Sequence, residues 1–271
     1  MDTVSGGHVD PTAWADLETK FRLLSAREGS VYLPNVAPTS KVKTVLIGME
    51  PSLGHWAPTP EKARKRVEQG LKNFLWSSRD FVIQYIFRRQ LGQSEYHLTD
   101  MAKGAMLAMQ AAEGREDRYD RWFDSLLTEL RLACLPGATV IAIGNRVGEY
   151  LDSRDREVCE ATGGGIYRLP HYSSVAVRHH LRFADDNRDA FEAYMAGFTR
   201  EPVVDTAKSL LQLANVEEPL RTSILGRLEG ANFGIRHLGH RVQVRTRTPA
   251  PTRVAGSHVS GQSRARSKGC P

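Results

Sequence analysis

Apolar residues follow two different periods along the chain, which predicts a mixture of helices and strands. Apolar positions three or four residues apart indicate helices, and short unbroken apolar runs indicate buried strands. Helices are expected over 12–28, 58–70, 73–91, 117–134 and 145–151, and in a segment that begins at 173. Strands are expected over 42–49, 96–101, 138–143 and 166–169.

The order of these elements predicts the fold class. Strands and helices alternate from residue 42 onward, which is typical of an α/β fold. We therefore expect residues 1–200 to form a three-layer αβα domain with a short, mostly parallel central sheet. Leucines at helical spacing predict a helical C-terminal extension over 201–240, and the remaining 241–271 form a basic tail that we expect to be disordered.

The charge of the chain is concentrated in this tail. The net charge is +6, and residues 241–271 hold seven Lys and Arg residues and no Asp or Glu, so the rest of the chain sums to −1. A basic tail rich in Pro, Gly and Ser is typical of a segment attracted to polyanions such as nucleic acids. A solubilising tail without a partner is the equal alternative.

Composition narrows the class of protein further. The chain is 41% hydrophobic and 25% charged, as in soluble globular proteins, and no apolar run approaches a membrane span. Three scattered cysteines argue against a structural zinc site and a four-cysteine iron–sulfur cluster. We expect a cytoplasmic monomer that needs no cofactor and no metal.

Two expected strands end in residues that suit chemistry. One strand ends in Gly48-Met49-Glu50-Pro51-Ser52, and another is followed by Pro170-His171-Tyr172-Ser173-Ser174. In an open α/β sheet, residues just past the carboxyl ends of strands line the ligand crevice. A carboxylate that faces a histidine there predicts hydrolytic or transfer chemistry. Taken alone, the first motif is equally a plain strand-ending turn, because Gly and Pro are ordinary turn residues.

Five motifs in order between Val42 and His180 resemble those of the uracil-DNA glycosylase superfamily, and most of all its mismatch-specific and thymine-DNA glycosylase branch. They are Gly48-Met49-Glu50-Pro51-Ser52, Asn73-Phe74-Leu75-Trp76, Thr99-Asp100-Met101-Ala102-Lys103, Gly144-Asn145-Arg146-Val147 and Leu169-Pro170-His171-Tyr172-Ser173. The chain departs from the family at Glu50, where the family has Asp or Asn, and at Tyr172, where it has Pro.

The resemblance implies a DNA glycosylase that flips a pyrimidine out of DNA and hydrolyses its N-glycosidic bond, leaving an abasic site. Glu50 would stabilise the cationic sugar and orient water, and His171 would stabilise the departing base. Residues implied to contact the base are Gly48, Met49, Pro51, Ser52, Phe74, Trp76, Asp100 and Asn145. Residues implied to contact DNA are Ser173, Ser174, Val175, Val177 and Arg178. A monofunctional enzyme is expected, because neither strand-end motif contains a lysine for a Schiff base and Lys103 looks peripheral.

Two side chains bear on the choice of base. An ionised Asp100 only accepts hydrogen bonds, which suits the N4 amino group of cytosine. Ser52 is small and leaves space for a substituent at C5 of the base. The expected substrate is therefore a 5-modified cytosine, as found in some phage genomes, and an anti-phage role follows. For Asp100, a helix N-cap in front of 101–111 is an equal alternative.

Three other functions are compatible with the same residues. A non-catalytic binder of modified or single-stranded DNA is one, because the extra methylene of Glu50 can displace its carboxylate. A uracil or thymine-mismatch repair glycosylase is the second. A hydrolase of free nucleosides or nucleotides is the third, although the basic tail argues against it.

Overall fold

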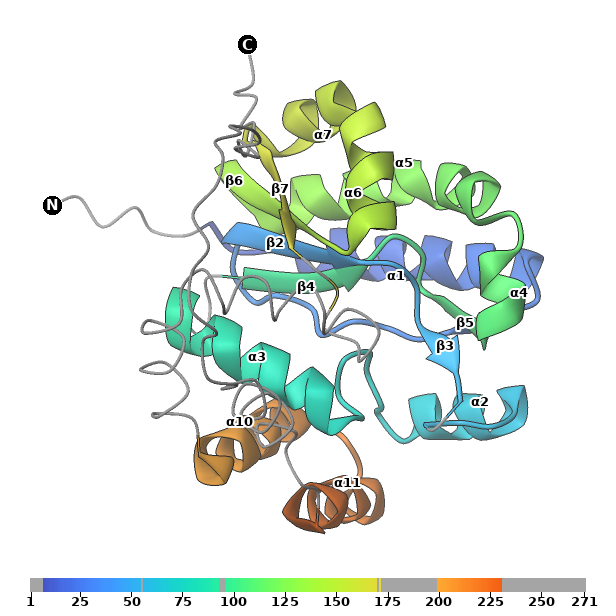
Figure 1. Ribbon diagram of the computed structural model, residues 1–271, viewed down its shortest axis with the longest axis vertical. Helices are drawn as coiled ribbons and strands as arrows, with labels where there is room; N and C mark the ends of the chain where they lie inside the picture. The colour runs from blue at the N-terminus through green and yellow to red at the C-terminus, as the bar shows by residue number, and fades with distance from the viewer. Residues whose placement is uncertain (1–6, 55, 93–95, 170, 172–198, 231–271) are drawn as a thin grey trace, which may run out of the picture.

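The structure is a computed structural model, and it describes residues 7–54, 56–92, 96–169, 171 and 199–230. Its centre is a four-stranded sheet in the order β4-β2-β6-β7, in which all neighbouring strands are parallel. The strands are β2 (Val42–Gly48), β4 (Tyr96–Asp100), β6 (Cys134–Ile143) and β7 (Ile166–Leu169). Helices cover both faces of this sheet (Figure 1), so the predicted three-layer α/β fold is confirmed.

Strand β2 shows why the sheet is covered on both faces. The side chains of Val45, Leu46 and Ile47 are all fully buried, and successive side chains of a strand point to opposite faces. Val45 and Ile47 pack with α5 (Arg115–Ala133), α6 (Asn145–Ser153) and α7 (Asp155–Thr162). Leu46 packs with α3 (Ser78–Leu91) on the other face. Burial on both faces selects a continuous apolar run, which is the signal that predicted this strand.

A second, smaller sheet lies beside the first. It has the order β1-β5-β3, with β1 (Val31–Tyr32), β5 (Gly104–Leu107) and β3 (Ser52–Leu53). Helix α1 (Pro11–Arg27) packs against β1 and α5, and α4 (Ala108–Ala112) follows β5 (Figure 1). The sequence did not predict this sheet, because a strand of two residues is too short to show a period.

The C-terminal helices complete the core below α3. Helices α10 (Arg200–Leu213) and α11 (Glu218–Gly230) bury Leu211 and Ile224 completely. These side chains belong to the same apolar cluster as Leu75 and Phe81, and α2 (Pro60–Glu68) contributes Ala63 to it. None of the helices described by the structure combines the length and the apolar character that crossing a membrane requires.

Several predicted boundaries are wrong. The helix expected over 73–91 starts only at Ser78, where Ser77 and Asp80 form a reciprocal capping box. The helix expected over 117–134 is followed directly by β6, so Gly137 lies inside a strand instead of ending the helix. Helix α7 was not predicted. The helix expected from residue 173 lies outside the described residues.

Candidate functional site

The ends of the four parallel strands lie together, and we call this side of the sheet the carboxyl edge. Gly48 at the end of β2 is the register partner of Asp100 at the end of β4, and Ile143 at the end of β6 is the partner of Leu169 at the end of β7. The residues that follow these ends include Glu50 after β2, Asn145 after β6 and His171 after β7. The topology therefore brings Glu50, Asp100, Asn145 and His171 to one edge of the sheet.

The strand order also sets a topological switch point at this edge. The chain leaves β2 toward β4 on one side, and it leaves β6 toward β7 on the other side. Connections that leave neighbouring strands in opposite directions open a crevice at their carboxyl ends, where α/β proteins bind ligands. This switch point lies between β2 and β6, whose ends are followed by Glu50 and by Gly144.

The carboxylate of Glu50 is held by two residues of α5. Oε1 accepts hydrogen bonds from Nε and Nη2 of Arg115 at 3.1 and 2.8 Å. Oε2 accepts a hydrogen bond from the hydroxyl of Tyr119 at 2.9 Å. Arg115 and Tyr119 are one helical turn apart, so both reach the same carboxylate. The Glu50 side chain is 4% exposed, and that of Arg115 is 25% exposed.

Tyr119 donates to Glu50 over the whole physiological pH range. Burial and the negative charge of Glu50 raise the pKa of Tyr119 far above its ordinary value. The ring of Tyr119 is fixed from behind by an edge contact with Tyr150 at 5.3 Å between ring centroids. The clamp of Arg115 and Tyr119 thus gives the Glu50 carboxylate a fixed position at the carboxyl edge.

Asp100 is a buried carboxyl group at the end of β4. The residue is 3% exposed, and its Oδ2 accepts a hydrogen bond from Nδ2 of Asn73 at 2.7 Å. Burial, reinforced by the charges of Glu50 and Glu129, raises the pKa of Asp100 to about 7 despite the opposing effects of Asn73 and Lys103. The helix N-cap alternative is wrong, because the chain continues into β5 and no helix begins at residue 101.

Gly48 is required by the position of Asp100. A Cβ atom at residue 48 would overlap Oδ1 of Asp100 and lie 3.5 Å from Cζ of Phe74. The backbone of β2 therefore approaches the carboxyl group and the aromatic ring closely, and only glycine permits this approach. Gly48 thereby sets how near Asp100 lies to the strand end that carries Glu50.

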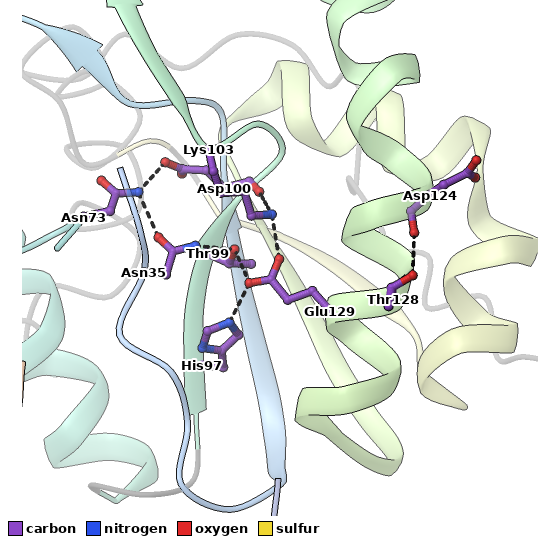
Figure 2. Close-up of polar contacts among 9 residues, drawn as sticks. All are labelled: Asn35, Asn73, His97, Thr99, Asp100, Lys103, Asp124, Thr128 and Glu129. Atoms are coloured by element: carbon purple, nitrogen blue, oxygen red, sulfur yellow. Dashed lines mark hydrogen bonds and ion pairs between the residues drawn. The ribbon is translucent and has the colours of Figure 1, made fainter. Parts of the chain in front are cut away.

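A chain of buried polar groups supports Asp100 from behind (Figure 2). Nζ of Lys103 lies 2.6 Å from Oε2 of Glu129 and donates to the backbone oxygen of Asp100 at 2.6 Å. Oε1 of Glu129 lies 2.9 Å from Nε2 of His97 and accepts from the hydroxyl of Thr99 at 2.8 Å. Burial opposes ionisation of Glu129, but Lys103 and His97 outweigh it and lower its pKa to about 2.

This chain of contacts corrects the sequence interpretation of Lys103. The residue was expected to be peripheral, yet it is fully buried and paired with Glu129. An ammonium group enters the core only with a partner, because an unpaired buried charge is costly. The chain continues through Asn35, which donates to Thr99 at 2.7 Å and accepts from Asn73 at 3.1 Å. Asn73 also donates to Asp100, so the chain of polar contacts returns to the residue where it began.

His171 lies against the end of β6. A Cβ atom added at Gly144 would lie 3.4 Å from the Cβ atom of His171. Gly144 also has a φ of 96°, a conformation that favours glycine. The backbone nitrogen of Gly144 donates to the oxygen of Leu169 at 2.7 Å, which ties the ends of β6 and β7 together. Asn145 is exposed at the first position of α6.

The other residues of the first motif have different surroundings. Pro51 is buried, and Met49 packs against the apolar cluster of α5 and β2. Ser52 is exposed in β3, where its backbone oxygen accepts from the indole of Trp56 at 2.6 Å. Ser52 thus lies at the surface beside the carboxyl edge.

The two predicted aromatic contacts lie in different environments. Phe74 is buried with its ring against Gly48, and its φ of 59° is rare for a residue with a side chain. Trp76 carries two guanidinium groups on its ring, with Arg66 4.3 Å and Arg227 3.5 Å from the centroid. Phe74 belongs to the carboxyl edge, whereas Trp76 joins α2 to α11.

The predicted DNA contacts Ser173, Ser174, Val175, Val177 and Arg178 lie outside the described residues, as does the basic tail. Within the described ranges, no three His, Cys, Asp or Glu side chains are grouped to hold a metal ion. A cavity of about 480 Å³ lies beside β4, between α3, α10 and the segment 36–40. Asn73 and Phe74 line it, and the described lining includes neither Glu50 nor Asp100.

Sequence reasoning missed Arg115, Tyr119 and Asn73 as members of the site. Arg115 carried a usable signal, because a cation at the first position of a helix faces the positive end of the helix dipole and needs an acidic partner. Tyr119 carried none, since its position on α5 is also the apolar face of that helix. Asn73 lies in a predicted motif, but its hydrogen bond to Asp100 spans 27 residues.

No protein-family model matches this sequence, and a search of curated proteins found none with significant similarity.

Proposed function

We propose that the protein is a monofunctional DNA glycosylase that hydrolyses the N-glycosidic bond of a flipped pyrimidine. The observation that carries this proposal is the gathering of Glu50, Asp100 and His171 at one carboxyl edge, each at the end of a different parallel strand. Cleavage of this bond needs a negative group for the sugar and polar groups for the base. The carboxyl edge holds both kinds.

Glu50 supports the sugar half of the reaction. The sugar develops positive charge as the bond breaks, and a preorganised carboxylate stabilises that charge without reorganising. Arg115 and Tyr119 fix the carboxylate in place. Oε1 accepts two hydrogen bonds and Oε2 accepts one, so Oε2 keeps a further lone pair that can orient the attacking water.

His171 and Asp100 support the base half. His171 lies over Gly144 at the end of β6, where it can donate a hydrogen bond to O2 of the base. Asp100 lies at the neighbouring strand end and suits the N4 amino group of cytosine. With the small, exposed Ser52 nearby in the chain, this favours a cytosine that carries a C5 substituent, and hence a defence role against phages with modified DNA.

The position of Lys103 favours simple hydrolysis. Its ammonium group is fully buried and ion-paired with Glu129, so it does not offer a free amine for a Schiff base with the sugar. DNA is the expected partner, with the basic tail contributing electrostatic attraction.

The test is base release from DNA. Duplex and single-stranded DNAs containing uracil, a thymine mismatch, 5-hydroxymethylcytosine or glucosylated 5-hydroxymethylcytosine are incubated with the protein, and mass spectrometry identifies the released base. Free nucleosides serve as the comparison. Glu50→Gln is the inactive variant, and Glu113→Gln, at the exposed residue that follows α4, is its matched control. Equal release by wild type and Glu50→Gln would contradict the proposal.

A non-catalytic binder of modified DNA is a second candidate, and one observation favours it. Both oxygens of Glu50 are already hydrogen-bonded to Arg115 or Tyr119, which leaves fewer positions for an attacking water. Tight binding of modified DNA by the wild type without release of any base would select this function.

A further inference from the structure

The charges near the carboxyl edge are distributed unevenly. Two acidic side chains, Glu50 and Glu129, lie near enough to Asp100 for their charges to act on it. Two buried or half-buried cations lie among them, and each is paired with another carboxylate. Arg115 binds Glu50, and Lys103 binds Glu129. The carboxyl group of Asp100 is left with an amide donor, Asn73, as its hydrogen-bond partner among the described residues.

Among the described residues, the charged groups that act on Asp100 come from β2, from α5 and from the turn after β4. Glu50 reaches it from the end of β2 and Glu129 from α5, and both disfavour a charge on Asp100. Lys103, on the turn after β4, favours the charge but directs its ammonium group to Glu129 and to the backbone oxygen of Asp100. Figure 2 shows Lys103 lying between the Asp100 backbone and Glu129. The surroundings therefore favour a neutral carboxylic acid.

The two oxygens of Asp100 are in different situations. Oδ2 accepts from Asn73, whose other amide hydrogen is directed to Asn35. Oδ1 lies against the Cα of Gly48, in the space that a side chain would fill. Among the described residues, no donor is hydrogen-bonded to Oδ1. A proton on the carboxyl group thus belongs on Oδ1, which faces the strand end that carries Glu50.

Cytosine needs a proton to leave, and uracil does not. Uracil departs as an anion whose charge spreads over two carbonyl oxygens, whereas cytosine has only one carbonyl oxygen. Cytosine offers an acceptor at ring N3 beside a donor at N4, and a neutral carboxylic acid offers the matching donor and acceptor. A carboxylic acid at this edge can therefore recognise cytosine and also supply the proton.

We propose, on the basis of the glycosylase activity proposed above, that Asp100 is the general acid that protonates ring N3 of a flipped cytosine as the base leaves. The C1′–N1 bond breaks, its electron pair goes to N1, and the proton from Asp100 makes the departing base neutral. Water adds to C1′ and gives its proton to Glu50. Exchange with solvent then returns the proton to Asp100 and removes it from Glu50.

This role predicts a difference between two bases in their dependence on pH. Asp100 holds its proton below a pKa of about 7. Cytosine release should therefore fall above that pH, by about tenfold for each pH unit. Uracil release uses the same Glu50 and His171 but no proton from Asp100, so it should lack this decline.

The experiment measures single-turnover release of 5-hydroxymethylcytosine and 5-hydroxymethyluracil between about pH 5.5 and about pH 9. Wild type is compared with Asp100→Asn and with Asp124→Asn, an exposed carboxylate on α5. We expect the decline at high pH for the cytosine substrate alone. Asp100→Asn should lose at least about 10²-fold in cytosine release and retain uracil release.

The two proposals fail in different ways. If the wild type releases neither base at any pH, the glycosylase function is wrong. If it releases bases but the cytosine and uracil profiles coincide, or only uracil is released, the role of Asp100 is wrong and the function stands. The comparison of the two wild-type profiles decides this even where Asp100→Asn does not fold.

Discussion

The raised pKa of Asp100 should be visible in folding stability, independently of any activity. Its pKa rises from an ordinary value of 3.8 to about 7, mainly because the group is buried. The unfolded chain releases this proton above about pH 4, whereas the folded protein keeps it until about pH 7. Between these values the unfolded state binds fewer protons, so the folded state loses stability as the pH rises. Three pKa units at 1.36 kcal/mol each give a loss of about 4 kcal/mol.

Asp100→Asn isolates this effect. An asparagine can still accept from Asn73, but it carries no titrating group, so its stability should not follow the same decline. Its amide also places a donor beside Gly48, which costs about 1–3 kcal/mol if unsatisfied. That cost is independent of pH. The difference in unfolding free energy between variant and wild type should therefore shift by about 4 kcal/mol in favour of the variant from pH 4 to pH 7.5.

Urea denaturation of both proteins at several pH values measures this difference. Asp124→Asn, the exposed control, should follow the wild type throughout. The Glu129 carboxyl, whose pKa is lowered to about 2, loses its stabilising contribution as the pH falls below about 4.5, but it does so in both proteins and therefore cancels in their difference. Parallel curves for Asp100→Asn and wild type between pH 4 and pH 7.5 would show that Asp100 ionises normally in the folded state.

Three further outcomes are expected. Glu50→Gln should abolish base release while DNA binding persists in fluorescence anisotropy, and His171→Ala should slow release by about 10²–10³-fold; release near the wild-type rate by the first variant refutes its role. Lys103→Met should lower the free energy of unfolding by about 3–5 kcal/mol, because Glu129 becomes a buried charge without its cation; a loss below about 1 kcal/mol would show that the pair is not formed. Deletion of 245–271 should weaken DNA binding and flatten its salt dependence while single-turnover release at saturation persists; loss of that release would place the tail in the site.

The part of the fold that sequence predicted is the part with periodic burial. Strand β2 is buried on both faces and reads as an apolar run, and α5 shows a wide apolar stripe. The small sheet lacks such a pattern, because β1 and β3 have two residues each. The early start predicted for α3 has a local cause. Phe74 and Trp76 are apolar like helix residues, but the positive φ of Phe74 ends any helix there.

The part of the site that sequence predicted is the part that lies at strand ends. Glu50, Asp100 and His171 each follow a strand, so a correct strand assignment places them at one edge. Their protonation and hydrogen-bond partners depend on contacts between distant residues. Arg115 lies 65 residues from Glu50, and Glu129 lies 30 residues from Thr99. Such contacts are set by how α5 packs on the sheet, which no short motif encodes.

The same packing explains why one carboxyl group at this edge differs from its neighbours. Helix α5 delivers Arg115 to Glu50 from its first turn and Glu129 to Lys103 from its last turns. The helix thereby pairs the lysine that follows β4 with Glu129 instead of Asp100. The ion pair between Lys103 and Glu129 thus stabilises the core. It also keeps the Lys103 ammonium group from pairing with an ionised Asp100 carboxylate. Replacing both Lys103 and Glu129 by apolar residues would remove one charge of each sign, so Asp100 should stay protonated near neutral pH in that variant. Replacing Glu129 alone should free the Lys103 ammonium group to pair with Asp100, and the pKa of Asp100 should then fall.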